Sequence, residues 1–193
     1  MKKSIHRLTN IILGSAIAIM LIMASCDTPT YINPQEYLDQ EQALLNEFYN
    51  SIQEDGQTWL DSMTSVTVDT IDHRNESGMM MFHTKVGTGD SVKVFKSVGF
   101  RYTQYQILRD TVDLPGMYAA ASNDYALSPQ VYTTFLLTDA NSSYATSIPQ
   151  GVNEAILNMR YGGECRVVVP STINSNSNYI TTIWDLRVTY LED

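Results

Sequence analysis

Residues 147–171 decide the fold, and they read SIPQGVNEAILNMRYGGECRVVVPS. Within this stretch, apolar side chains recur at Val152, Ala155, Ile156 and Met159, a spacing that puts one apolar stripe on a helix. The spacing therefore predicts a short amphipathic helix over residues 152–161.

A strand is predicted directly after this helix. Gly162 and Gly163 follow the last apolar position and suit the left-handed conformation that ends a helix. Residues 165–169 form a β-branched run, and Pro170 removes the next donor of a strand ladder. On this pattern alone, the stretch is one helix–strand unit of an α+β domain.

The order of residues in this stretch resembles a segment of FKBP-type peptidyl-prolyl isomerases. That segment reads roughly V-I-P-G-W-E-E-A-L-x-x-M-x-x-G-E, then an apolar strand and I-P-S. The matching residues are Ile148, Pro149, Gly151, Glu154, Ala155, Met159, Gly163, Glu164, Pro170 and Ser171.

Further segments match the same family in the same order. Residues 77–90 resemble its opening strand and G-x-G-D turn, residues 101–103 the H-Y-T of its second strand, and residues 181–191 its closing strand. The chain as a whole is similar to small FKBP-like lipoproteins of Bacteroides-type bacteria. The resemblance covers residues 77–193 and implies an α+β fold, with a curved antiparallel sheet wrapped around one short helix.

The remaining patterns agree with that fold and add an N-terminal helix. Alternating apolar residues predict strands over 64–72, 79–86, 92–102 and, most clearly, 180–190. A helical pattern begins at Pro34 and ends at about Gln53. This helix is expected to dock on the domain or pair with a second copy, unless it is simply solvated. The predicted division is an N-terminal helix over 34–62 and an FKBP-like domain over 63–193.

The N-terminus predicts the compartment. Three basic residues precede a short apolar run over 11–23, and the small residues Ala24 and Ser25 stand directly before Cys26. The run is too short to span a bilayer, which takes about 20 residues, and the arrangement is that of a bacterial lipoprotein signal. We expect a signal peptide over 1–25 and a lipidated tether over 26–33, with Cys26 acylated. The alternatives are an ordinary signal with an incidental cysteine, or an uncleaved anchor.

The charge and the cysteine content restrict the kinds of partner that we expect for the chain. The 193-residue chain carries a net charge of −9, and removal of residues 1–25, with three bases and no acid, takes it to −12. An acidic surface disfavours nucleic acid, so the expected contact with membrane lipid is through acylated Cys26. The expected localisation is the bacterial cell envelope, at the outer rather than the inner membrane. Cys165 then has no partner, and its apolar context predicts a buried side chain.

The family's isomerase pocket transfers only in part. The resemblance implies that Tyr102, Ile148 and Trp184 stand for pocket residues, that Val152 occupies the place of a tryptophan, and that Tyr179 partly replaces a missing loop tyrosine. The family's F-D pair has no counterpart, because the Tyr- and Ser-rich block 110–147 takes its place. No firm catalytic residue and no cofactor are expected.

Other constellations are weaker. His73 lies near Asp69, Asp72 and Glu76, a set that suggests a metal site but is more typical of a solvated acidic loop, so no metal is expected. The glycines of residues 87–89 lack the third glycine and the following helix of a phosphate-binding loop.

Two functions of different classes remain open. The first is a prolyl isomerase or folding helper with a reduced pocket, whose partner is an extended or proline-containing polypeptide. The second is a non-catalytic binding or assembly module on the same scaffold. A third, more remote hypothesis is an enzyme with its chemistry in the block 110–147. Fold alone does not decide among them, so whether the chain is an enzyme stays open.

Overall fold

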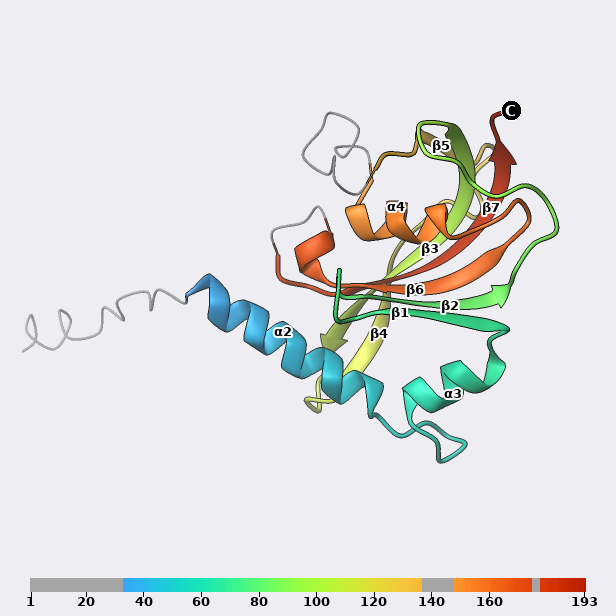
Figure 1. Cartoon of the computed structure of the whole chain (residues 1–193). Helices are drawn as coiled ribbons and strands as arrows, with labels where there is room; N and C mark the ends of the chain where they lie inside the picture. The colour runs from blue at the N-terminus through green and yellow to red at the C-terminus, as the bar shows by residue number, and fades with distance from the viewer. Residues whose placement is uncertain (1–32, 137–147, 175–177) are drawn as a thin grey trace, which may run out of the picture. The chain divides into compact units, whose positions relative to one another are not determined.

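A computed structural model describes residues 33–136, 148–174 and 178–193 (Figure 1). The predicted signal peptide, Cys26 and nearly all of the tether lie outside the described residues. In the described part, an antiparallel sheet of seven strands carries helices on its two faces, which confirms the α+β class. None of the helices in this part is long and apolar enough to cross a membrane.

The sheet has the order β1-β2-β6-β7-β3-β4. The short strand β5 pairs with the first residues of β3, and β4 pairs with its later residues. Every pairing is antiparallel. The C-terminal strand β7 therefore lies in the middle of the sheet. The strands are β1 (Asp69–His73), β2 (Met79–Lys85), β3 (Ser97–Arg109), β4 (Pro115–Ser122), β5 (Gln130–Thr133), β6 (Glu164–Val169) and β7 (Thr182–Leu191).

Helix α4 (Gln150–Leu157) packs on one face of the sheet. Alternation along β7 sends Trp184 to this face, where it joins Val152 and Met159 in one buried cluster. Val152 is fully buried and Met159 is 1% exposed. The expectation that the sheet packs around one short helix is confirmed for this face.

The other face is covered by α2 (Pro34–Tyr49) and α3 (Trp59–Val66). Phe48 and Trp59 lie with ring centroids 4.7 Å apart, and Trp59 meets Phe82 of β2 edge-on at 5.8 Å. Ile183 of β7 belongs to the same buried cluster. Of the alternatives for the N-terminal helix, docking on the domain is confirmed.

A buried carboxylate holds α2 in place. Oε1 of Glu41 accepts hydrogen bonds from the Ser171 backbone N–H at 2.8 Å and from the Thr181 hydroxyl at 2.7 Å. Its other oxygen accepts from the Ser171 hydroxyl. Because each donor leaves water to make these bonds, losing the carboxylate would strand several buried polar groups. The helix is thus tied to the end of β6 and the start of β7.

The region between α2 and β2 differs from the sequence prediction. The strand expected over 64–72 is the end of α3 followed by β1, which begins only at Asp69. Helix α3 begins because the Thr58 hydroxyl accepts a hydrogen bond from the Asp61 N–H at 3.1 Å, which caps the helix. Its apolar side chains Trp59 and Met63, four residues apart, then face the sheet. The segment 34–62 therefore contains α2 and the start of α3, rather than one helix.

Element ends also differ from the prediction. Helix α2 ends at Tyr49, four residues before Gln53, and α4 ends at Leu157 rather than near residue 161. The strand expected from residue 92 begins at Ser97 and runs on to Arg109. In the block 110–147, where no strand was predicted, β4 and β5 extend the sheet beside β3. Residues 137–147 of that block lie outside the described residues.

Candidate functional site

A row of aromatic side chains lies on the sheet face that carries α4. The rings of Tyr102 (β3) and Trp184 (β7) are 5.0 Å apart at an interplanar angle of 47°. Phe100 lies 5.9 Å from Tyr102 and meets Tyr132 of β5 edge-on at 5.3 Å. Alternation along β3 explains why Phe100 and Tyr102 share a face, and the pairing of β3 with β7 brings Trp184 beside them.

The start of α4 supplies two further residues of the predicted pocket. Ile148 precedes the helix and Val152 lies in its first turn, and both belong to the buried cluster that contains Trp184. Their exposed fractions are 3% and 0%. Four of the five predicted pocket residues, Tyr102, Ile148, Val152 and Trp184, are thus brought together on one face. We call these four residues, two aromatic and two aliphatic, the aromatic cluster.

Tyr179 lies elsewhere. Its ring stacks on Tyr37 of α2, with centroids 5.1 Å apart and an interplanar angle of 13°. It also borders a small cavity of about 70 Å³ together with Glu41, Leu45 and Ile107, on the side of α2. The expectation that Tyr179 completes the pocket therefore needs correction. The backbone of Tyr179 is in the left-handed region, with a φ angle of 52°.

Few polar groups face the aromatic cluster. The indole N–H of Trp184 donates to the Thr182 hydroxyl oxygen at 3.0 Å, which also accepts from the Asn174 side chain at 2.9 Å. The Tyr102 hydroxyl makes no hydrogen bond with the described residues, and Tyr102 is only partly buried. Buried Tyr132 likewise has no hydroxyl partner there, and burial raises its pKa. Because the Tyr132 hydroxyl is buried, the Tyr102 hydroxyl is the donor left in this region for a bound carbonyl group.

Two polar residues of α4, Asn153 and Glu154, are buried, although neither was assigned a role in the site from the sequence. The side chain of Asn153 is fully buried and bridges the backbone of Phe135, accepting from its N–H at 3.1 Å and donating to its carbonyl at 2.9 Å. Glu154 Oε1 lies 2.7 Å from His73 Nδ1 and accepts from the Ser77 hydroxyl at 3.0 Å. These contacts fix the helix to the segment that follows β5 and to the β1–β2 turn.

In the set near His73, ion pairs engage His73 and Asp72. The hydrogen bond to Glu154 raises the pKa of His73, and Asp72 forms a double hydrogen bond with Arg74 at 2.6 and 2.8 Å. Among residues 33–136, 148–174 and 178–193, no group of three or more His, Cys, Asp or Glu side chains is arranged to hold a metal ion.

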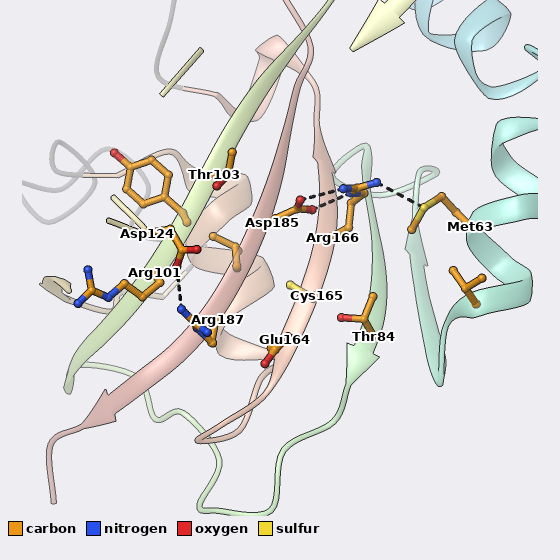
Figure 2. A pocket seen from close by; sticks show the side chains of 13 residues that line it. Met63, Thr84, Arg101, Thr103, Asp124, Glu164, Cys165, Arg166, Asp185 and Arg187 are labelled. Carbon is orange, nitrogen blue, oxygen red and sulfur yellow. Dashed lines mark hydrogen bonds and ion pairs between the residues drawn. The ribbon is translucent and has the colours of Figure 1, made fainter. Parts of the chain in front are cut away.

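A depression of about 390 Å³ lies on the opposite side of the sheet from α4 (Figure 2). Arg166 and Asp185, cross-strand partners, form a double hydrogen bond at 2.6 and 2.8 Å. Arg187 donates to Asp124 at 2.7 Å, and Met63 of α3 contributes to the wall. The sequence could not reveal this surface, because it depends on the register of β6 against β7. Its paired charges leave no strong preference for one sign of ligand.

No family model and no curated protein matches this chain. Among solved structures, a peptidyl-prolyl cis-trans isomerase from Pseudomonas syringae is 15% identical, with 85% of this chain and 99% of that chain covered and a TM-score of 0.49. FkpA from Escherichia coli is 13% identical, with 99% and 71% covered and a TM-score of 0.45. The N-terminal domain of FKBP42 from Arabidopsis thaliana is 11% identical, with 66% and 95% covered and a TM-score of 0.48. The chain is thus similar to FKBP-type peptidyl-prolyl isomerases at low sequence identity.

Proposed function

We propose that this chain is a lipid-anchored protein of the bacterial cell envelope whose FKBP-like domain receives extended or proline-containing polypeptide at the aromatic cluster. In this proposal it is a folding helper of the peptidyl-prolyl isomerase type with a reduced pocket. The observation that carries the proposal is the 5.0 Å pair of Tyr102 and Trp184 beside the start of α4.

The chemistry of prolyl isomerisation suits such a surface. The barrier, about 18–20 kcal/mol, comes from amide resonance, so catalysis needs neither a nucleophile nor a metal. It needs an apolar environment that holds the twisted amide, together with a donor for its carbonyl oxygen. Tyr102, which is only partly buried, supplies apolar ring surface, and buried Trp184 packs behind it. The Tyr102 hydroxyl has no partner among the described residues that would keep it from donating.

Two observations favour weak catalysis. Val152, where the family places a tryptophan, is an aliphatic side chain with 0% exposure, so it offers no ring to a substrate. The Trp184 indole N–H is already engaged by Thr182. The same observations support the second candidate, a non-catalytic module that binds polypeptide without accelerating isomerisation.

The test is NMR exchange spectroscopy on a short peptide with one Ala-Pro bond, using the soluble chain that begins at Asp27. If each of two missing pocket groups forfeits about 1.4 kcal/mol of differential stabilisation, the rate falls at least about a hundredfold below that of a complete family member. Tyr102→Ala is expected to weaken peptide binding.

Tyr179→Ala is the matched control, because it removes the same side chain beside α2 rather than in the aromatic cluster. Catalysis at the level of a complete family member would refute the reduced pocket. Peptide binding that is absent, or that responds to Tyr179→Ala and not to Tyr102→Ala, would refute the assignment of the site.

A further inference from the structure

The two edges of the sheet are built differently. Strand β1 forms one edge and β4 the other, and among the described residues neither has a second strand partner. An edge strand presents unpaired backbone N–H and C=O groups, which natural proteins usually protect with charges, proline or covering elements. The edge at β1 has charges of this kind: Asp69, Asp72 and His73 are among its five residues.

The edge at β4 has less protection: its one device is a β-bulge, where Ala120 has no partner on β3. Its sequence, PGMYAAAS, contains no charged residue, and its single proline, Pro115, stands at the first position. The five residues from Tyr118 to Ser122 are all exposed, so the described residues leave this part of the edge uncovered. Three successive alanines, 119–121, place little side-chain bulk beside an incoming chain.

Hydrogen bonds at both ends hold β4 in its extended form. Before the strand, Asp110 Oδ1 accepts from the Val112 and Leu114 N–H groups at 2.8 and 2.9 Å. After the strand, Asn123 Oδ1 accepts from the Tyr102 N–H at 2.6 Å, and the Asn123 side-chain amide donates to the Phe100 carbonyl at 3.2 Å. An edge that is already ordered loses less conformational entropy when it binds.

We propose that β4 binds an extended segment of another polypeptide as an added strand, with the main chain supplying the contacts. The partner is a basic polypeptide segment. The chain itself has a net charge of −9, so a second copy would bring like charges together, whereas a basic segment would be attracted. Two of the aspartates that flank β4, Asp113 and Asp124, are paired with Arg109 and Arg187 and add little to this attraction.

This position also bears on the proposed function. Strands in a sheet are about 4.8 Å apart, so a strand added to β4 lies about 10 Å from β3, which carries Tyr102. In this respect the inference rests on the proposed function, because a captured polypeptide would be held close to the aromatic cluster. The strand addition itself requires no proline and is tested without one.

The first experiment uses the full-length chain in detergent micelles and a fluorescent, proline-free peptide, acetyl-Lys-Thr-Val-Lys-Val-Thr-Val-Lys-amide. Fluorescence anisotropy measures its binding. A twin peptide carries N-methyl groups on alternate residues, which keeps the side chains and removes ladder donors. The twin is expected to bind at least about tenfold more weakly. A second twin with glutamate in place of each lysine is also expected to bind more weakly, and added salt should reduce that difference.

The second experiment changes β4. The register shifts here, so that Tyr105 faces Ala119 and Gln104 faces Ala121, which leaves Ala120 without a partner on β3. Proline is tolerated at such bulges, so Ala120→Pro is expected to block the outer edge while keeping the pairing with β3. Peptide binding should fall at least about tenfold in Ala120→Pro and should stay unchanged in the control Ala120→Ser. Thermal melts verify that both variants fold, and if the proline variant does not, the N-methyl twin alone decides.

Several results would overturn the proposal. Equal binding of the peptide and its N-methyl twin would mean that side chains, not the strand edge, are recognised. Absence of peptide binding, together with a dimer in analytical ultracentrifugation that Ala120→Pro disrupts, would identify a second copy as the occupant. Prolyl exchange measured on the same Ala120→Pro protein reports on the aromatic cluster separately, so failure at one site is distinguishable from failure at the other.

Discussion

At the scale of single residues, two glycines show how a shared backbone conformation has different consequences in different surroundings. Gly87 and Gly56 both have positive φ angles, 83° and 78°. A Cβ atom on Gly87 would lie 2.6 Å from the Gly163 nitrogen and 2.6 Å from the Tyr161 carbonyl oxygen, whereas one on Gly56 would meet nothing within 4 Å. Only Gly87 is required both by its conformation and by its close approach to another backbone segment.

The two alanine variants should therefore separate these effects. Gly56→Ala is expected to cost about 1–2 kcal/mol of unfolding free energy, the penalty of a left-handed backbone for alanine. Gly87→Ala adds overpacking against backbone atoms and should cost about 3 kcal/mol or more. Urea unfolding measures both. Equal losses would mean that the contact with residues 161–163 is not as close as the structure has it.

The two histidines of the domain should affect the unfolding free energy in opposite directions as pH changes. Hydrogen bonding to Glu154 raises the pKa of His73, so its stabilisation is complete below the unfolded pKa of about 6.5 and is lost as pH rises through the raised value. Burial lowers the pKa of His83, so its contribution is present above about 6.5 and is lost as pH falls. The window above pH 6.5 therefore reports on His73.

The check is the unfolding free energy of the natural chain and of His73→Gln between pH 6.5 and 8.5. The advantage of the natural chain is expected to shrink as pH rises across this window, because glutamine keeps a donor for Glu154 but does not titrate. An advantage that stays constant or grows would show that the bond between His73 and Glu154 does not control the titration.

At the scale of elements, the sequence predicted those with an unambiguous period and missed those decided by tertiary contacts. The alternation along 180–190 and the stripe over 152–159 correspond to β7 and α4. Helix α3 was missed because residues 64–68 alternate and are partly β-branched, a pattern that favours a strand. The burial of Trp59 and Met63 against the sheet overrides that preference.

The candidate site was likewise predicted only in part. The family resemblance indicated Tyr102, Ile148, Val152 and Trp184, which do gather on one face. It misplaced Tyr179, because a position in a loop says nothing about which side of the sheet the ring will contact. The pairing of Arg166 with Asp185 depends on the register of two strands and has no signal in the local sequence.

The docking of α2 gives a prediction for one element. Glu41→Ala removes the acceptor for Ser171 and Thr181 and is expected to cost about 1–3 kcal/mol, whereas Glu41→Gln keeps one acceptor oxygen and should cost less. Hydrogen exchange should show faster exchange of the α2 amides in Glu41→Ala. Unchanged protection of α2, or equal acceleration in β6 and β7, would contradict a local role for this carboxylate.

At the scale of the whole molecule, the proposed attachment to a membrane depends on residues outside the folded domain. Basic side chains are few, and the net charge is −12 once residues 1–25 are removed, so electrostatic attraction to anionic lipid cannot hold the protein at a bilayer. The acyl chains expected on Cys26 are the remaining attachment, and two or more chains make it stable.

Replacing Cys26 tests this attachment. Cys26→Ala is expected to lack the acyl mass at its N-terminus, and either to keep residues 1–25 or to move from the detergent phase to the aqueous phase. Mass spectrometry and detergent-phase partitioning measure these outcomes. Cys165→Ala is the control, because Cys165 is 3% exposed within β6 and should not affect either readout. Identical processing and partitioning in Cys26→Ala would exclude the lipoprotein assignment.

The position of β7 has a consequence for the order of events during synthesis. Strand β7 is the last of the described strands along the chain, and it lies between β6 and β3 in the sheet. It therefore connects one half of the sheet, β1-β2-β6, to the other half, β3-β4-β5. Until it emerges, the two half-sheets have no common member and each exposes an edge that is central in the finished domain. Pairings between distant parts of a chain form slowly, and incomplete sheets are prone to aggregate. The sheet therefore cannot be completed before β7 is available.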